Sequence, residues 1–104
     1  MTEQAAPPKL LGFQRKFLRG LAHSYRAVVQ VGQEGVTTAV VAAVRQALQD
    51  HELVKVRLHR PKDKKAMAQQ LATRTDAELC GLVGHQAILY RPRAEDPTIE
   101  VPSR

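Results

Sequence analysis

Two glycines separated by two residues are the feature of this sequence whose type and spacing best suit a chemical role, the binding of an anion. The segment Gly32-Gln33-Glu34-Gly35 follows a β-branched stretch, 27–31, and precedes a helical pattern. Glycines let a backbone approach a phosphate closely, and the first amides of a following helix can donate hydrogen bonds to it. The spacing therefore suits an anion clamp, although it also closes many loops that bind nothing.

Basic side chains stand on both sides of this segment. The helical pattern before it has an apolar side, whose members are Leu11, Leu18, Leu21 and Ala22. Arg15, Lys16 and Arg19 occupy the neighbouring arc at a spacing of 100° per residue. After the glycines, Lys55 and Arg57 alternate with valines, so that strand is expected to pack one face inward and to display charge on the other. The alternative is that the basic arc is only a solvated surface of the helix and binds no partner.

Residues typical of catalysis or of metal binding form no productive pattern. The four histidines are His23, His51, His59 and His85, and they include no i, i+4 pair. Cys80 is the single cysteine, which excludes an internal disulfide and a zinc site built on cysteines. Asp50 with Glu52, and Asp76 with Glu78, flank junctions between elements, where acids are usually solvated. With no Walker loop and no dinucleotide fingerprint, we expect no catalytic residue, no metal and no cofactor.

Length and charge narrow the class of protein. A chain of 104 residues makes one domain, and no apolar run of about 18 residues could cross a bilayer. No secretion signal is visible, so a cytoplasmic location is expected, and a monomer is assumed. Residues 1–93 hold fifteen basic and seven acidic side chains, a net charge of +8, whereas 94–104 carry −2. This balance favours a polyanionic partner over a membrane surface.

Periodicity predicts three helices and four strands around these residues. The helices are expected at 9–23, 36–51 and 62–75, and the strands at 27–31, 53–59, 78–83 and 86–91. The last two strands make a hairpin through Gly84-His85. The order α-β-α-β-α-β-β predicts a compact α/β sandwich with a mixed four-stranded sheet. Residues 1–8 are expected to form a disordered leader, 9–93 the single domain, and 94–104 a mobile acidic tail with prolines.

Several segments together resemble a known family. They are Gln14-Arg15-Lys16, Leu18 to His23, Val28 to Thr37, Ala47-Leu48, His51 to Val56, Gly84, and Ile88 to Pro92. In order and spacing they are similar to the CRM domain, in particular to its stand-alone bacterial form, the YhbY-like RNA-binding proteins. The resemblance covers about residues 10 to 92.

The resemblance implies a fold similar to the C-terminal domain of bacterial translation initiation factor 3, RNA binding, and no catalysis. Bacterial members are associated with precursors of the large ribosomal subunit, so ribosome biogenesis is the implied process. The family's RNA-contacting loop falls on Gly32, Gln33, Glu34 and Gly35. Its basic first helix falls on Arg15, Lys16 and Arg19.

This chain departs from the family pattern at two positions. The loop has Gln33-Glu34 where a basic residue usually follows the first glycine, and an acid beside a phosphate weakens binding. The hairpin has His85 where lysine is usual. Arg26 and Lys55 are the candidates that could compensate for these departures.

The leading hypothesis is an RNA-binding protein that binds precursor large-subunit ribosomal RNA through the Gly-x-x-Gly loop and a basic face. Because only four aromatic residues are present and none suggests an exposed stacking platform, we expect recognition of backbone and shape more than of bases. The alternative is a protein-interaction module whose basic face docks an acidic partner. A small hydrolase is a distant third hypothesis.

Overall fold

The computed structural model describes residues 9–103, so the expected leader at 1–8 lies outside the described residues. In chain order the elements are α1 (Gly12–Ala22), β1 (Ala27–Val31), α2 (Thr38–His51), β2 (Leu53–Leu58), α3 (Lys64–Thr75), β3 (Glu78–Val83) and β4 (Gln86–Tyr90). The predicted order and the predicted types are confirmed, and the element ends lie within a few residues of the expected ones.

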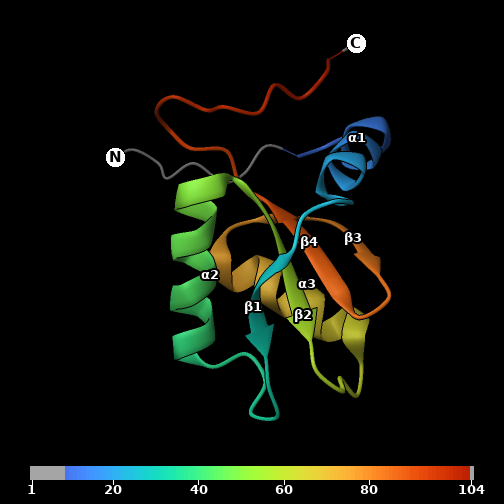
Figure 1. The fold of residues 1–104 in the computed structure, drawn as a ribbon, viewed down its shortest axis with the longest axis vertical. Helices are drawn as coiled ribbons and strands as arrows, with labels where there is room; N and C mark the ends of the chain where they lie inside the picture. Colours follow the sequence, from blue (N-terminus) through green and yellow to red (C-terminus); the bar gives the residue numbers. More distant parts are fainter. Residues whose placement is uncertain (1–8, 104) are drawn as a thin grey trace.

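The four strands form one mixed sheet in the order β1-β2-β4-β3 (Figure 1). Strands β1 and β2 run parallel, whereas β4 is antiparallel to both of its neighbours. The β3–β4 hairpin therefore inserts its second strand beside β2 and leaves β1 at one edge. Pairs such as Val54 with Leu89 and Val56 with Ala87 set the register of the central strands.

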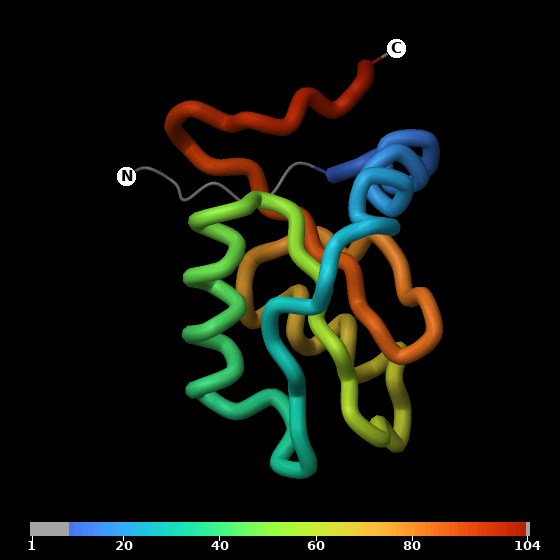
Figure 2. The backbone as a smooth tube through the Cα atoms, viewed as in Figure 1, coloured from blue at the N-terminus to red at the C-terminus, as the bar shows by residue number. Residues whose placement is uncertain are grey.

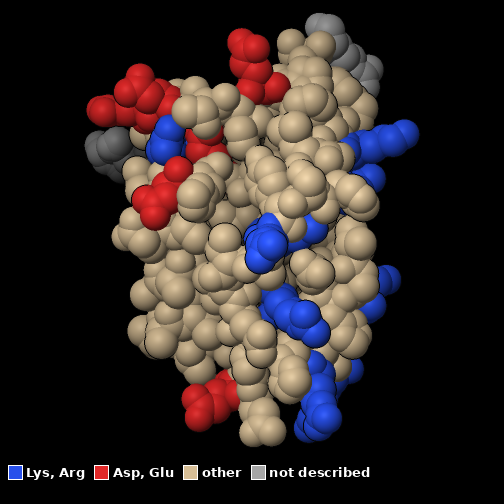
Figure 3. Space-filling model, in the orientation of Figure 1, with Lys and Arg blue, Asp and Glu red and all other residues tan. Residues whose placement is uncertain are grey.

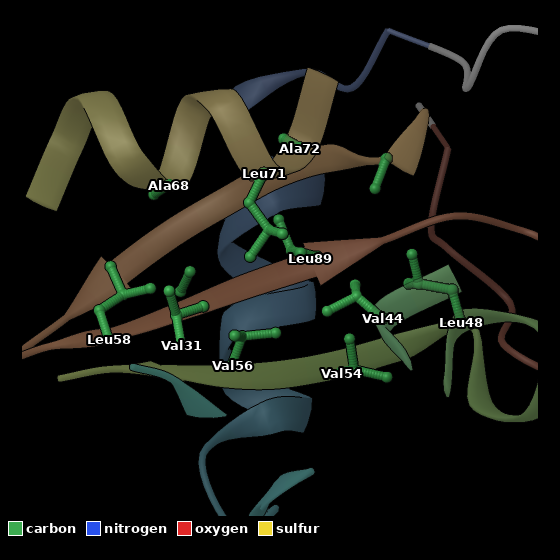
Figure 4. Close-up of a cluster of buried hydrophobic side chains, with 12 residues drawn as sticks. Val31, Val44, Leu48, Val54, Val56, Leu58, Ala68, Leu71, Ala72 and Leu89 are labelled. Carbon is green, nitrogen blue, oxygen red and sulfur yellow. The ribbon is translucent and has the colours of Figure 1, made fainter. Parts of the chain in front are cut away.

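Helices α2 and α3 cover one face of the sheet and enclose the main core (Figures 1 and 4). Its buried members are Val31, Val44, Leu48, Val54, Val56, Leu58, Ala68, Leu71, Ala72, Ala77, Ala87 and Leu89. The inward side chains of β2 are the alternate residues 54, 56 and 58, as the sequence predicts. Lys55 and Arg57 accordingly lie on the other face of the sheet.

Hydrogen-bonded caps begin the two covering helices. The Thr37 side chain accepts a hydrogen bond from the Val40 amide at 3.1 Å, and the Asp63 carboxylate accepts one from the Ala66 amide at 3.1 Å. Each satisfies an amide that the first turn leaves unpaired. The cap at Asp63 delays the start of α3 beyond Pro61, so the chain at 59–63 forms a loop.

Helix α1 packs on part of the opposite face of the sheet and forms a second cluster. The buried members of this cluster are Leu10, Leu18, Ala22, Leu53, Cys80, Ile88 and Tyr90. Leu11 and Leu21, which the sequence places on the apolar side of this helix, are exposed by 47% and 37%. Leu18 and Ala22 rather than Leu11 and Leu21 face the sheet, and Arg19 lies against Gly81, where the lack of a side chain leaves space for it.

After β4 the chain turns back and crosses the end of the sheet toward α1 (Figure 2). The Glu52 carboxylate accepts hydrogen bonds from the amides of Arg93, Thr98 and Ile99 at 2.8 to 3.1 Å. The side-chain amide of Gln14 donates to the Pro102 carbonyl at 2.9 Å. The sequence predicts a mobile segment here, whereas the structure shows one in contact with the body. A buried carboxylate that gathers backbone amides leaves no periodic signal in a sequence.

Candidate nucleic-acid interface

The Gly32–Gly35 loop lies at the end of the sheet opposite to α1 (Figure 1). The Gly35 amide donates to the Gly32 carbonyl at 3.1 Å, which closes the turn between β1 and α2. Gly32, Gln33 and Glu34 are exposed. Gly35 has φ +78°, a conformation that favours glycine, whereas Gly32 lies outside the left-handed region and faces open space. The two glycines therefore have different roles: Gly35 permits the turn, and Gly32 keeps its outer surface accessible.

A hollow lies on each side of this loop. The larger one, of about 590 Å³, lies between the loop and α3, and its wall includes His59, Arg60 and Lys62. The smaller one, of about 300 Å³, lies between the loop and α2, and its wall includes Glu34 and Thr37. Among the described residues, no lysine or arginine lines the smaller hollow. The wall of the larger hollow also includes one acid, Asp63, but Arg60 and Lys62 outnumber it, and we call this hollow the cationic hollow.

Backbone contacts hold the walls of the cationic hollow in place. The His59 amide donates to the Val31 carbonyl at 3.0 Å, which ties the start of the 59–63 loop to the residue before Gly32. The Leu58 amide donates to the His85 carbonyl at 2.7 Å. Arg60 has φ +50°, which is uncommon for a residue with a side chain and is found mostly at turns and functional sites. The hollow is a consequence of how β1 and β2 end.

Three of the basic residues predicted for the site hold the fold together. The Arg15 guanidinium donates to the Leu10 carbonyl at 2.6 Å and lies 3.9 Å from the Glu78 carboxylate. The Arg19 guanidinium donates to the Cys80 carbonyl at 2.8 Å. The Lys55 ammonium donates to the carbonyls of His23 and Tyr25 at 3.1 and 3.0 Å. These cations satisfy carbonyls of the chain itself, so less of their charge is available to a partner.

The other three predicted basic residues, Lys16, Arg26 and Arg57, are exposed. Within residues 9–103 none of their side chains has a hydrogen-bond or ion-pair partner. Figure 3 shows lysine and arginine side chains in a band along this face of the molecule, down to its lower end. Acidic side chains gather mainly at the upper end, where the C-terminal segment lies (Figures 1 and 3). The predicted residues thus form no single cluster, because α1 and the loop lie at opposite ends of the band.

Sequence reasoning missed His59, Arg60 and Lys62 as members of the site. The signal that could have indicated them is the basic run that continues from Arg57 to Lys65. The expectation about aromatic residues also differs from the structure, since Phe13, Phe17 and Tyr25 are 37% to 39% exposed. All three lie on α1 or just after it, remote from the loop.

The remaining reactive groups have environments that suit a structural role. Burial, with a smaller contribution from the Glu78 carboxylate, raises the pKa of the Cys80 thiol to about 12, so this group stays protonated at neutral pH. Burial by itself would raise the pKa of Glu52. The hydrogen bonds from Arg93, Thr98 and Ile99 outweigh that effect and hold the pKa below its ordinary value of 4.5.

Residues 9–103 contain neither a candidate metal site nor a helix suited to span a membrane. No three histidine, cysteine or acidic side chains come together in a group that could hold a metal ion. No helix in this part of the chain has both the length and the apolar character needed to cross a membrane.

Comparison with known proteins identifies similar chains. The model of the CRS1 / YhbY (CRM) domain family matches residues 10–91. An RNA-binding protein of Haemophilus influenzae is 36% identical over 93 residues, which cover 88% of this chain and 93% of that protein. The "Probable RNA-binding protein YqeI" of Bacillus subtilis is 33% identical over 95 residues, which cover 89% and 99%. The solution structure of a hypothetical protein from Staphylococcus aureus superposes with a TM-score of 0.80 at 32% identity, and covers 90% of this chain and all of that one.

Proposed function

This chain belongs to the CRS1 / YhbY (CRM) domain family, and from this premise we propose that it binds RNA. The observation that carries the proposal is the position of the Gly32–Gly35 loop beside three cationic or imidazole side chains, His59, Arg60 and Lys62. Exposed amides and cations at one place bind phosphates, because both compensate negative charge. The names of the two relatives, which match over nearly their full lengths, support the same assignment.

The basic face extends this contact along the sheet. Arg57 lies in β2, the strand that leads to His59, and Arg26 precedes β1. Both side chains are exposed and have no partner within the described residues. A strand of RNA bound at the loop could therefore continue over β2 toward α1, where Lys16 is also exposed.

We propose further that the RNA is precursor large-subunit ribosomal RNA, and that the protein acts in the cytoplasm, without catalysis, during ribosome assembly. The resemblance to the stand-alone bacterial form supports this choice. The charge supports it too, since a net +8 on residues 1–93 suits a phosphate-rich particle.

A salt titration with a matched pair of variants tests RNA binding. If about four phosphates on single-stranded RNA are neutralised, the logarithm of the affinity falls with the logarithm of salt concentration at a slope near −3. Gly32→Leu blocks the approach of a phosphate to the loop and lowers the affinity. Ala42→Leu places the same side chain at an exposed position of α2 and leaves the affinity unchanged. A slope near zero for the wild-type protein contradicts the proposal.

Crosslinking in cells tests the identity of the RNA. Ultraviolet irradiation, followed by sequencing of the bound RNA and mapping of the crosslinked peptides, is expected to enrich large-subunit ribosomal RNA. The crosslinked peptides are expected to contain the 32–35 and 57–62 segments. Efficient crosslinks to other RNAs would retain RNA binding and reject the ribosomal assignment, and a lack of crosslinks would reject both.

A further inference from the structure

The two hollows beside the Gly32–Gly35 loop differ in charge, and this difference decides where a polyanion can pass. On the α2 side the wall includes Glu34, which repels a phosphate. On the α3 side the wall includes the acid Asp63, but also His59, Arg60 and Lys62, so its cations outnumber its acid. A strand that contacts the loop backbone lowers its electrostatic energy by passing on the α3 side. The acid that weakens this loop in comparison with the family pattern therefore also directs the strand.

The hollow on the α3 side contains more than phosphate-binding groups. Besides its cations it is lined by Met67, which is half-buried against the main core, and by the exposed residues Gln33 and Gln70. A thioether offers a polarizable apolar surface to an aromatic ring. Each glutamine amide has both a donor and an acceptor, which match the edges of a base. A site for phosphate alone would need neither feature.

The size and the construction of the hollow fit one nucleotide. Its volume of about 590 Å³ lies within the range of small-ligand sites in proteins, about 300 to 1,000 Å³. The contact between the His59 amide and the Val31 carbonyl fixes the distance between its two loops. Asp63, which also lines the hollow, is fixed as the cap of α3. Such a site is formed before the ligand binds.

We infer that this hollow receives the base of one unstacked nucleotide of a single-stranded RNA, while the adjacent phosphate lies on the Gly32–Gly35 loop between the cations. The inference rests on the proposed function and adds a base-binding site to it. The sequence predicts recognition of the backbone more than of bases, and this site is the place where the structure favours base contact.

An abasic scan tests the inference. A short single-stranded RNA of fixed length is prepared as a series in which one base at a time is removed and the sugar-phosphate backbone is kept. The affinity of each RNA is measured for the wild-type protein, for Gln70→Ala, and for the control Gln69→Ala, an exposed glutamine of the same helix that does not line the hollow. These substitutions change no charge and suit a helix.

The inference predicts that, for the wild-type protein and for Gln69→Ala, removal of the base at one position lowers the affinity by about fivefold to tenfold, as the loss of a stacked base does. Gln70→Ala lowers the affinity for the intact RNA and reduces the effect of the abasic site at that position. Equal affinities for all members of the series would overturn the inference. So would identical behaviour of the two glutamine variants.

A pair of lysine variants separates this result from the proposed function. Lys62 lines the hollow, and Lys65, the second residue of α3, does not. Lys62→Ala is expected to weaken binding of the intact RNA more than Lys65→Ala, with a smaller salt slope. If the wild-type protein binds RNA with a clear salt slope but shows no abasic effect, the base site is rejected and RNA binding stands. If no salt-dependent binding is seen at all, the proposed function itself fails.

Discussion

Thr98 donates two hydrogen bonds to the Glu52 carboxylate, from its amide and from its hydroxyl, both at 2.8 Å to the same oxygen. Glu52 is fully buried and ends α2 at φ +66°. Arg93 and Ile99 donate to the same carboxylate. This clasp fixes the acidic C-terminal segment at one end of the molecule and brings Ile99 and Val101 onto the second hydrophobic cluster. The tail acids are thereby held remote from the loop that we propose binds phosphate.

Glu52→Gln is expected to destabilise the protein. The amide of glutamine keeps one oxygen that can accept from Thr98 and Ile99, but it presents N–H groups to the Arg93 amide, so that buried hydrogen bond is lost and the others lose the strengthening effect of a negative charge. The expected loss is about 2 kcal/mol in the free energy of unfolding, measured by urea denaturation. Glu100→Gln, an exposed position of the same segment, is the control and is expected to change stability little. Equal stability of both variants would show that the clasp is not formed.

The stability contributed by Glu52 is expected to depend on pH. Its pKa is lowered by folding, so the folded state binds this proton less readily than the unfolded state. The contribution is therefore complete at pH values above the ordinary pKa of 4.5 and is lost as the pH falls below it. Urea denaturation between neutral and acid pH is expected to give a smaller decrease for Glu52→Gln than for the wild-type protein. Parallel curves for the two proteins would argue against a lowered pKa.

The two glycines of the loop are expected to respond differently to alanine. Gly35→Ala forces a side chain into the left-handed region and is expected to cost about 1 kcal/mol of folding free energy. Gly32→Ala places its Cβ in open space and is expected to leave the melting temperature nearly unchanged. Thermal denaturation of both variants compares them directly. A larger loss for Gly32→Ala than for Gly35→Ala would contradict this assignment.

Substitutions of Arg19 and Lys16 are expected to change different properties: the first lowers stability, and the second lowers RNA affinity. Arg19→Ala removes the hydrogen bond to the Cys80 carbonyl and the packing against Gly81, and is expected to cost about 1 to 2 kcal/mol of stability. Lys16→Ala removes an exposed charge and is expected to lower RNA affinity with stability retained. Denaturation and binding are measured for both variants. The opposite pattern would assign Arg19 to the interface and Lys16 to the fold.

Local patterns predicted the elements of this fold accurately because each pattern reflects a local requirement. Alternation of Val54, Val56 and Leu58 with Lys55 and Arg57 follows from the two faces of a strand. The prediction of α3 was less accurate at its start. The sequence predicts a helix from residue 62, whereas the Asp63 cap begins it at Lys64. For α1, periodicity predicted a helix but not its rotation, because the space above Gly81 exists only once β3 is in the sheet.

The sequence by itself determined the order of helices and strands, the two-faced character of β2, the Gly-x-x-Gly loop and the excess of positive charge. These follow from neighbours along the chain, where side-chain periodicity and glycine spacing are directly visible. Only the tertiary structure decided which cations remain available, since Arg15, Arg19 and Lys55 meet carbonyls that other segments supply. It also brought His59, Arg60 and Lys62 beside Gly32, and Thr98 onto Glu52. Such contacts join residues that are distant in the chain. They form only when the strands pair and the segments pack together, so local sequence preference does not reveal them.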